Sequence, residues 1–140
     1  MFLLDTNVLS EQRKMASGRA HPNVASWLKQ VPDDRALVSV ITIQELQVWA
    51  MLQARRDARQ GISLQRWIDD KVIGEFSERI LIVDLPVARR CAELHVPNPR
   101  SRHDALIAAT ALVHGLTIVT RNTSDFAPMG VKLLNPWEPQ

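Results

Sequence analysis

Short apolar runs alternate along the chain with longer stretches in which apolar residues recur every three or four positions. Continuous apolar runs are typical of parallel strands covered on both faces, whereas the longer spacing is typical of helices. Strands are therefore predicted at 2–4, 37–41, 80–83, 117–120 and 131–134. Helices are predicted at about 22–30, 42–59, 63–76, 86–94 and 103–114, with a short segment at 8–10 and loops at 11–18 and 96–102.

Proline, glycine and capping residues support these boundaries. Pro22 and Pro86 stand at first helical positions. Gly61 and Gly115 are each placed to end a helix. Because strands alternate with helices, the sequence predicts an α/β fold, a three-layer α/β/α sandwich with a mostly parallel central sheet. No repeat or linker divides the 140 residues, so one domain spanning 1–140 is expected.

Charge and cysteine content restrict the class of protein. The 17 Lys and Arg residues against 15 acidic ones give a net charge of +2, too small an excess to indicate nucleic-acid binding by itself. Thirteen of the 17 are Arg, which binds phosphate oxygens bidentately and so mildly favours a phosphate ligand. A single cysteine, no leader-like opening and no apolar run of about 20 residues predict a soluble, cytoplasmic protein with no membrane role.

Four acidic residues are expected at one edge of the sheet. Asp5 directly follows the first strand, and Glu45 is expected in the first turn of the helix after the second. Asp104 opens the apolar helix before the fourth strand, and Asp125 follows that strand by a few residues. Ligands of open α/β sheets bind beyond the carboxyl ends of the strands, where the helix N-termini also lie. This edge is therefore the predicted site.

The neighbours of these acids are neutral, which disfavours a network of salt bridges. They are mainly Thr6, Asn7, Thr120, Asn122 and Ser124. Two carboxylates about 4 Å apart repel each other by roughly 4 kcal/mol at an effective dielectric constant of 20. A cluster must therefore share protons or bind a cation, and oxygen ligands without His or Cys favour Mg²⁺ or Mn²⁺.

Each acid also has a purely structural interpretation. Glu45 could complete a capping box with Thr42, Asp104 could stabilise a helix dipole, and Asp125 could belong to an Asx turn. Asp5 is the hardest to explain in this way. Basic residues beside the acids, Arg121 and Arg102 first, with Arg100 and His103, are candidates for phosphate contacts, and a solvated loop is the other interpretation.

Several segments together resemble the PIN domain. They are, in chain order, Leu3–Val8, Thr42–Leu46, Asp104–Ala111, and Thr120–Asn122 with Asp125 and Phe126. With the closing Asn135, Pro136 and Trp137, their order and spacing are similar to those of the bacterial VapC toxins, nearest to the FitB-like branch. The resemblance covers essentially the whole chain.

This resemblance implies a divalent-metal-dependent ribonuclease acting on RNA such as tRNA or rRNA, the toxin half of a toxin–antitoxin pair. The ligands of Mg²⁺ or Mn²⁺ would be the four acids, Asp5, Glu45, Asp104 and Asp125. These acids would be held in place by the neutral residues Thr6, Asn7, Thr120 and Asn122. A VapB- or FitA-like antitoxin would neutralise the enzyme. The toxin would be linked to DNA only through this antitoxin. A homodimer, and a larger assembly with the antitoxin, would be expected.

The same resemblance assigns the helical pair at 42–76 to an antitoxin clamp. Its apolar residues, Trp49, Met51, Leu52, Trp67 and Ile68, exceed what two small helices need, although core packing is an equal explanation for any one of them. Trp27 and Trp137 are expected to be core or dimer contacts rather than platforms for bases.

Two departures from the family pattern and two other functions stay open. The stretch 86–104 is shorter than is usual, and some FitB-like members carry the last acid where this chain has Asn122. A catalytically silent PIN domain, acting as a binding partner in an antitoxin–DNA repressor complex, would have the same fold. A phosphoacceptor receiver domain is disfavoured because it needs an acidic pair near the first strand, which this chain lacks.

Overall fold

The computed structural model describes residues 1–140, and its five strands form a single sheet in the order β3-β2-β1-β4-β5. The strands are β1 (Phe2–Leu4), β2 (Ala36–Ser39), β3 (Ile80–Leu81), β4 (Thr117–Val119) and β5 (Leu133–Leu134). All neighbouring pairs are parallel, and Phe2 lies opposite both Ala36 of β2 and Thr117 of β4. The predicted parallel sheet is therefore confirmed, with no antiparallel strand.

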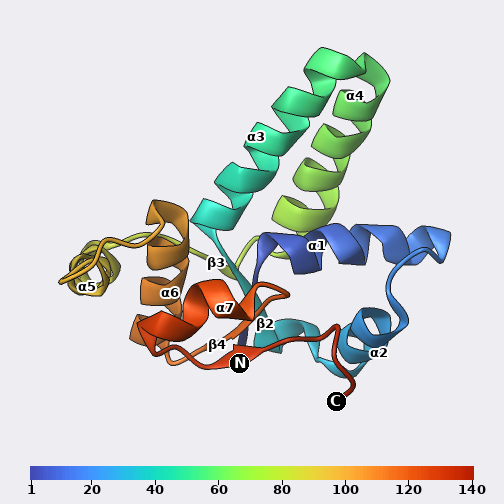
Figure 1. The fold of residues 1–140 in the computed structure, drawn as a ribbon. Coiled ribbons are helices and arrows are strands. Elements are labelled where there is room, and N and C mark those ends of the chain that lie inside the picture. Colours follow the sequence, from blue (N-terminus) through green and yellow to red (C-terminus); the bar gives the residue numbers. More distant parts are fainter.

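Helices cover both faces of this sheet (Figure 1). Leu3 and Ile118 point into one hydrophobic core, whereas their neighbours Leu4 and Val119 point into the other. The first core lies under α5 (Leu85–Leu94), α6 (Arg102–His114) and α7 (Thr123–Phe126). The second lies under α1 (Thr6–Arg13), α2 (Pro22–Gln30), α3 (Val40–Arg56) and α4 (Ala58–Trp67). These layers confirm the predicted three-layer sandwich.

The segment after β1 is helical, so the loop predicted at 11–18 is wrong. Helix α1 spans Thr6–Arg13 and continues as a 3₁₀ turn, Lys14–Ser17. Asp5 caps it, because its Oδ1 accepts the Thr6 backbone N–H at 2.8 Å, and Val8 and Leu9 are fully buried. The remaining side chains of α1 are polar and half-buried, so the sequence shows too few apolar residues there for a helical period to be recognised.

Helices α3 and α4 form a long hairpin that projects from the body of the molecule (Figure 1). Gly61 was predicted to end a helix, but it lies inside α4. The sequence also suggested Ser63 as the cap of the second helix of the pair, and Ser63 too lies inside α4. Asp57 makes the turn, accepting hydrogen bonds from the backbone N–H groups of Arg59 and Gln60. After Trp67 the hairpin continues as a π-helical turn, Ile68–Ile73. None of the helices has the length and apolar character required to cross a lipid bilayer.

Helix α3 begins two residues earlier than predicted. Its N-cap is Ser39, whose Oγ accepts the Ile41 backbone N–H at 3.0 Å. Thr42, the predicted cap, is buried inside the first turn, and its hydroxyl has no hydrogen-bond partner. Glu45 therefore lies in the second turn of α3, which rules out the capping box as the explanation for that acid.

Replacing Ser39 and Thr42 one at a time should show which of them caps α3. Ser39→Ala is expected to lower the free energy of unfolding by about 1 kcal/mol, because the cap hydrogen bond is lost. Thr42→Val should leave the free energy of unfolding unchanged or raise it, because a buried hydroxyl without a partner costs about 1–3 kcal/mol. Urea unfolding of both variants measures the difference. The reverse ranking would return the cap to Thr42.

Candidate active site

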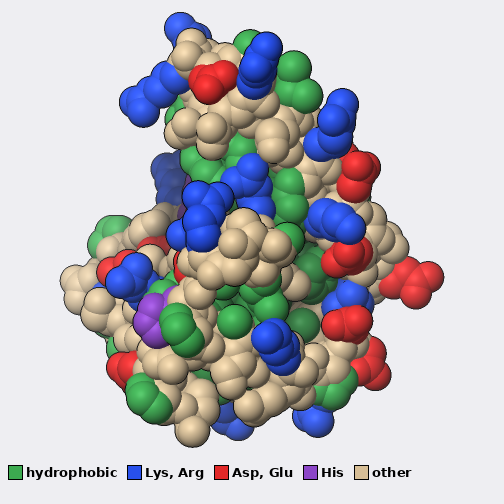
Figure 2. All heavy atoms as spheres, turned by 90° about the vertical axis from the view of Figure 1, so that its right-hand side faces the viewer, with side chains coloured by type: hydrophobic (Ala, Val, Ile, Leu, Met, Phe, Trp, Pro, Cys, Tyr) green, Lys and Arg blue, Asp and Glu red, His purple; other side chains and the backbone are tan.

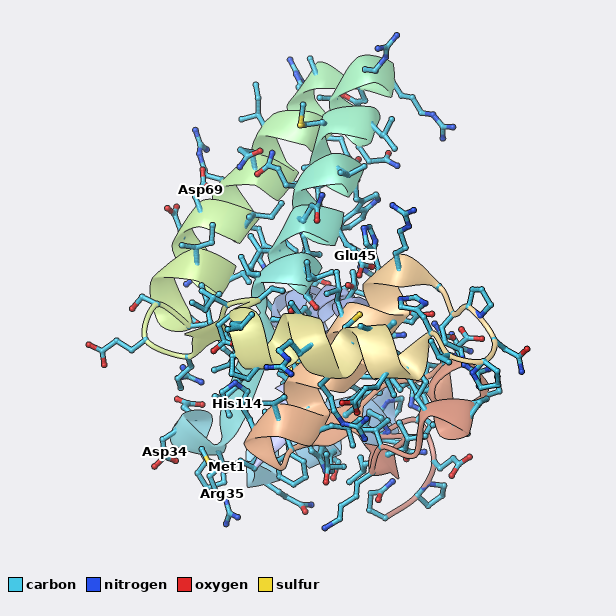
Figure 3. The ribbon with its side chains drawn as sticks, turned by 90° about the vertical axis from the view of Figure 1, so that its left-hand side faces the viewer. Met1, Asp34, Arg35, Glu45, Asp69 and His114 are labelled. Atoms are coloured by element: carbon cyan, nitrogen blue, oxygen red, sulfur yellow. The ribbon has the colours of Figure 1, made fainter.

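Three of the four predicted acids lie at the topological switch point of the sheet, between β1 and β4. The chain leaves β1 for β2 on one side, whereas β4 lies on the other, so a crevice opens beyond the carboxyl ends of β1 and β4. Asp5 follows β1 and Thr120 follows β4, and the Thr120 hydroxyl donates to Asp5 Oδ2 at 2.8 Å. Glu45 lies at this edge in Figure 3, whereas Met1 and His114 lie at the opposite one.

Asp5 is held rigidly in a nearly buried position, with 7% of its surface exposed. Its Oδ1 accepts the Thr6 N–H, and its Oδ2 accepts the Thr120 hydroxyl. The Thr120 oxygen in turn accepts the Asn7 side-chain amide at 3.3 Å and the Asn122 backbone N–H at 3.0 Å. Because that oxygen is already an acceptor twice, its single proton is directed to Asp5.

Three of the four predicted acids line one cleft of about 400 Å³. Its lining, called here the acidic cleft, consists of Asp5, Thr6, Asn7, Ser10, Glu11, Glu45, Asp104, Arg121, Asn122 and Trp137. Glu45 is tied to the β1 end of the cleft, since its Oε2 accepts the Thr6 hydroxyl at 3.2 Å. Asp104 arrives from the first turn of α6. Three separate elements of the fold thus bring carboxylates together.

Asp125 and Arg102 do not line the acidic cleft. Asp125 is exposed in the first turn of α7, and Asn122 lines the cleft instead. Arg102 is exposed at the start of α6. Asp125 nevertheless lies close enough for its charge to raise the pKa values of Asp5 and Asp104.

Burial and neighbouring negative charge make Asp5, Glu45 and Asp104 hard to ionise. Burial raises the pKa of Asp5, although hydrogen bonds from Thr120 and Thr6 oppose the shift. Burial and then the charge of Asp5 raise the pKa of Glu45. The same two causes, in that order, raise the pKa of Asp104. None of the three carboxylates forms an ion pair with Lys or Arg.

These shifts predict how stability depends on pH in the absence of metal. A carboxyl group with a raised pKa binds its proton more tightly in the folded state than in the unfolded state. The protonated group therefore stabilises the fold fully at pH values below its ordinary pKa, which is 3.8 for Asp and 4.5 for Glu. That contribution is lost as the pH rises through the raised pKa. The melting temperature of Glu45→Gln in EDTA should therefore fall less between about pH 4 and pH 7 than that of the unaltered chain. Identical slopes would contradict the repulsion.

The donor set suits a hard divalent cation, but the side chains do not form a finished ligand cage. Carboxylate, hydroxyl and amide oxygens are the ligands that Mg²⁺ and Mn²⁺ prefer. No three His, Cys, Asp or Glu side chains approach closely enough to hold one ion together as they stand. Each Asp5 oxygen accepts only one hydrogen bond within the chain, which leaves it a lone pair for a further ligand.

Three lining residues were not predicted from the sequence: Ser10, Glu11 and Trp137. Asn7, Ser10 and Glu11 recur at the spacing of one helix face, so they could have been found had α1 been recognised. Burial raises the pKa of Glu11, but hydrogen bonds from the His21 backbone N–H and from Lys14 outweigh it and lower that pKa overall. Glu11 therefore serves mainly to join α1 to the start of α2.

Comparison with known proteins agrees with this architecture. The PIN domain family matches residues 2–131. The chain is 34% identical to VapC ribonuclease Y4jK of Sinorhizobium fredii over 99% of both chains, and 34% identical to toxin FitB of Neisseria gonorrhoeae over 98% of this chain and 99% of that one. The solved structure of FitAB bound to an IR36 DNA fragment superposes with a TM-score of 0.88 at 30% identity, over 100% and 98% of the two chains. This chain therefore belongs to the PIN-domain family.

Proposed function

We propose that this protein is a divalent-metal-dependent ribonuclease that hydrolyses phosphodiester bonds in RNA, and that it is the toxin of a toxin–antitoxin pair. The observation that carries the proposal is the convergence of Asp5, Glu45 and Asp104, none paired with a cation, in one cleft at the switch point of the sheet. Relatives of the same length named as a VapC ribonuclease and as toxin FitB support it.

The residues in and around the acidic cleft would have two different roles, binding the metal and orienting its ligands. Asp5, Glu45 and Asp104 would hold Mg²⁺ or Mn²⁺, with Asp125 adding negative charge from outside the cleft. A divalent ion bound there would lower the pKa of a bound water and neutralise charge on the scissile phosphate. Thr6 and Thr120 orient the carboxylates by donating to Glu45 and Asp5. Asn7 and Asn122 hold the Thr120 hydroxyl in the orientation that this requires.

The test is cleavage of total RNA by the purified protein. Reactions with Mg²⁺, with Mn²⁺ and with EDTA are compared, and the ends of the products are mapped. The proposal expects discrete cleavage sites that appear only with the metals. Cleavage that survives EDTA would exclude the metal dependence. No cleavage of any RNA under the three conditions would exclude the ribonuclease.

A partner is expected on the face formed by α1, α2 and residues 67–79, where two cavities with mixed apolar and charged linings lie side by side. Their volumes are about 320 and 220 Å³, and both are lined by Gln12, Glu75 and Phe76. Figure 2 shows hydrophobic side chains gathered on this side of the molecule, with both basic and acidic side chains around them. We propose that a cognate antitoxin covers these cavities in the cytoplasm, and that a homodimer of the chain reaches DNA only through it.

The hairpin residues assigned to the clamp divide into two groups. Met51 and Leu52 are 62% and 57% exposed, whereas Ile68 is fully buried in the core and Trp49 and Trp67 are half-buried. Core packing is thus the role of Ile68. The exposed pair remains available for the antitoxin.

A catalytically silent binding module is the second candidate, because no three carboxylates yet meet around one point. Thermal stabilisation by Mn²⁺ separates the two functions. The nuclease predicts a rise in melting temperature that is lost in Asp104→Asn, since binding to the folded state alone raises stability. A melting temperature that Mn²⁺ does not change in the unaltered chain would favour the silent module.

A further inference from the structure

Arg121 is the only basic residue that lines the acidic cleft. Four carboxylates share that lining, those of Asp5, Glu11, Glu45 and Asp104. The Arg121 guanidinium nevertheless makes no hydrogen bond or ion pair within the chain. An unpaired cation at the rim of an acidic cleft keeps its five N–H donors for an anion that enters from outside.

The guanidinium is held by Trp137 instead of by an acid. Its central carbon lies 5.5 Å from the centroid of the Trp137 ring, which is a cation–π contact. The contact uses none of the guanidinium N–H groups as hydrogen-bond donors to the chain, so they stay available to a phosphate.

Both ends of this arrangement are anchored in the fold. The Arg121 backbone N–H donates to Asn7 Oδ1 at 3.3 Å, which ties it to the turn that carries Asp5. The Trp137 backbone N–H donates to Asn135 Oδ1 at 3.0 Å, and its carbonyl accepts the Asn23 side-chain amide at 2.7 Å. The half-buried indole also packs against the core under α1 and α2. The ring is therefore a fixed support, whereas the arginine side chain on it is exposed.

We propose that Arg121 binds an RNA phosphate next to the scissile bond and that Trp137 is the residue that positions it, an inference that rests on the ribonuclease function proposed above. Without the indole, the guanidinium would be free to turn toward the acids that share its cleft, and pairing with them would neutralise the acids and remove the phosphate ligand. This role comes in addition to the core contact expected for Trp137, which the packing of the indole confirms.

Binding of RNA, measured apart from cleavage, tests the proposal. The Asp5→Asn chain serves as the parent, and the probe is a fluorescein-labelled, single-stranded RNA of about 12 nucleotides followed by anisotropy at several NaCl concentrations. Arg121→Ala should raise Kd about tenfold, and Trp137→Ala at least about threefold. Each should reduce the slope of log Kd against log salt by about 0.7, the value of one phosphate contact. Trp137→Phe, which keeps a weaker ring, should lie between.

Matched variants decide between positioning and other roles. Arg59→Ala removes an equal charge from the exposed side of α4 and should leave Kd within about twofold, since one distant, screened charge contributes little. In the Arg121→Ala background, Trp137→Ala should have no further effect on Kd. An equal loss there would mean that the ring contacts RNA itself, and an unchanged Kd for folded Trp137→Ala would mean that it has no role; either result overturns the proposal.

The ribonuclease function and the positioning role of Trp137 can be refuted separately. If the unaltered chain cleaves no RNA with Mg²⁺ or Mn²⁺, the ribonuclease is wrong whatever the binding constants are. If it cleaves RNA but Arg121 and Trp137 do not act together in binding, only the positioning role is wrong. Thermal melting of each variant, with Trp137→Phe as the milder substitution, distinguishes lost binding from lost folding.

Discussion

Asp5→Asn is expected to lower RNA cleavage on the order of a thousandfold, the largest effect of any single substitution in this chain. Asp5 lies at the centre of the acidic cleft, and its charge acts on both Glu45 and Asp104. The amide keeps the shape of the side chain but removes the negative charge that a divalent cation needs. Initial rates on a mapped cleavage site, with Mn²⁺ present, measure the loss.

The same variant should remain folded, because two effects of the amide oppose each other. Burial raises the pKa of Asp5, so the charged form is disfavoured in the folded state at neutral pH, and a neutral amide removes that cost. The amide has only one acceptor oxygen, so it keeps one of the two hydrogen bonds from Thr6 and Thr120, and the lost one costs about 1–3 kcal/mol. A cooperative melting transition in EDTA checks that the variant is folded. Asp34→Asn, an exposed change at the opposite edge of the sheet (Figure 3), is the matched control and should leave cleavage unaltered. Cleavage by Asp5→Asn at the original rate, with contaminating nuclease excluded, would refute the site.

Gly61→Ala is expected to give the largest loss of stability, about 2–3 kcal/mol. A Cβ at Gly61 would lie 2.6 Å from the Ala54 Cα and closer still to its Cβ, so the two helices of the hairpin would have to move apart. The clash is with backbone, which cannot rotate away as a flexible side chain can. Guanidinium chloride unfolding should show a lower midpoint, and a domain of this size should lose roughly 6–12 °C in melting temperature.

A second glycine of the same hairpin region provides the control for this substitution. Gly74 has helical dihedral angles and is exposed, and a Cβ there would meet only the Asp69 carbonyl at 3.5 Å. Gly74→Ala should therefore raise the free energy of unfolding by about 0.5–1 kcal/mol, the usual gain in helix propensity. If the two variants shifted stability in the same direction, close helix packing at Gly61 would not be its role.

The sequence was most informative where burial left a periodic pattern. The strands, the helices begun by Pro22 and Pro86 and the apolar helix ended by Gly115 were predicted close to their observed bounds. The edge of the sheet followed from the alternation of strands and helices, and with it the common cleft of Asp5, Glu45 and Asp104. The resemblance to the PIN domain is confirmed by the family match.

The errors share a physical cause, since each concerned a choice that local sequence leaves undecided. Ser39 and Thr42 can both cap a helix, and only packing against the sheet decides between them. Glycine ends helices in general, but Gly61 lies within one because Ala54 of the facing helix needs its space. Trp137 is far in sequence from the acids, and the parallel course of β5 brings it to their edge. Which acid or amide completes a metal site stays a prediction, with Asp125 outside the cleft and Asn122 at its rim.

The central position of β1 has a consequence for how the protein is made. The hydrogen-bonded pair Asp5 and Thr120 is separated by 115 positions in the chain. At a synthesis rate of about 5–20 residues per second, roughly 6–23 s pass between the addition of the two residues. Strand β1 must meanwhile wait for β4, and pairing over such a distance is slow. The growing chain therefore carries Asp5 without its partner, and the acidic cleft can form only after β4 has been made.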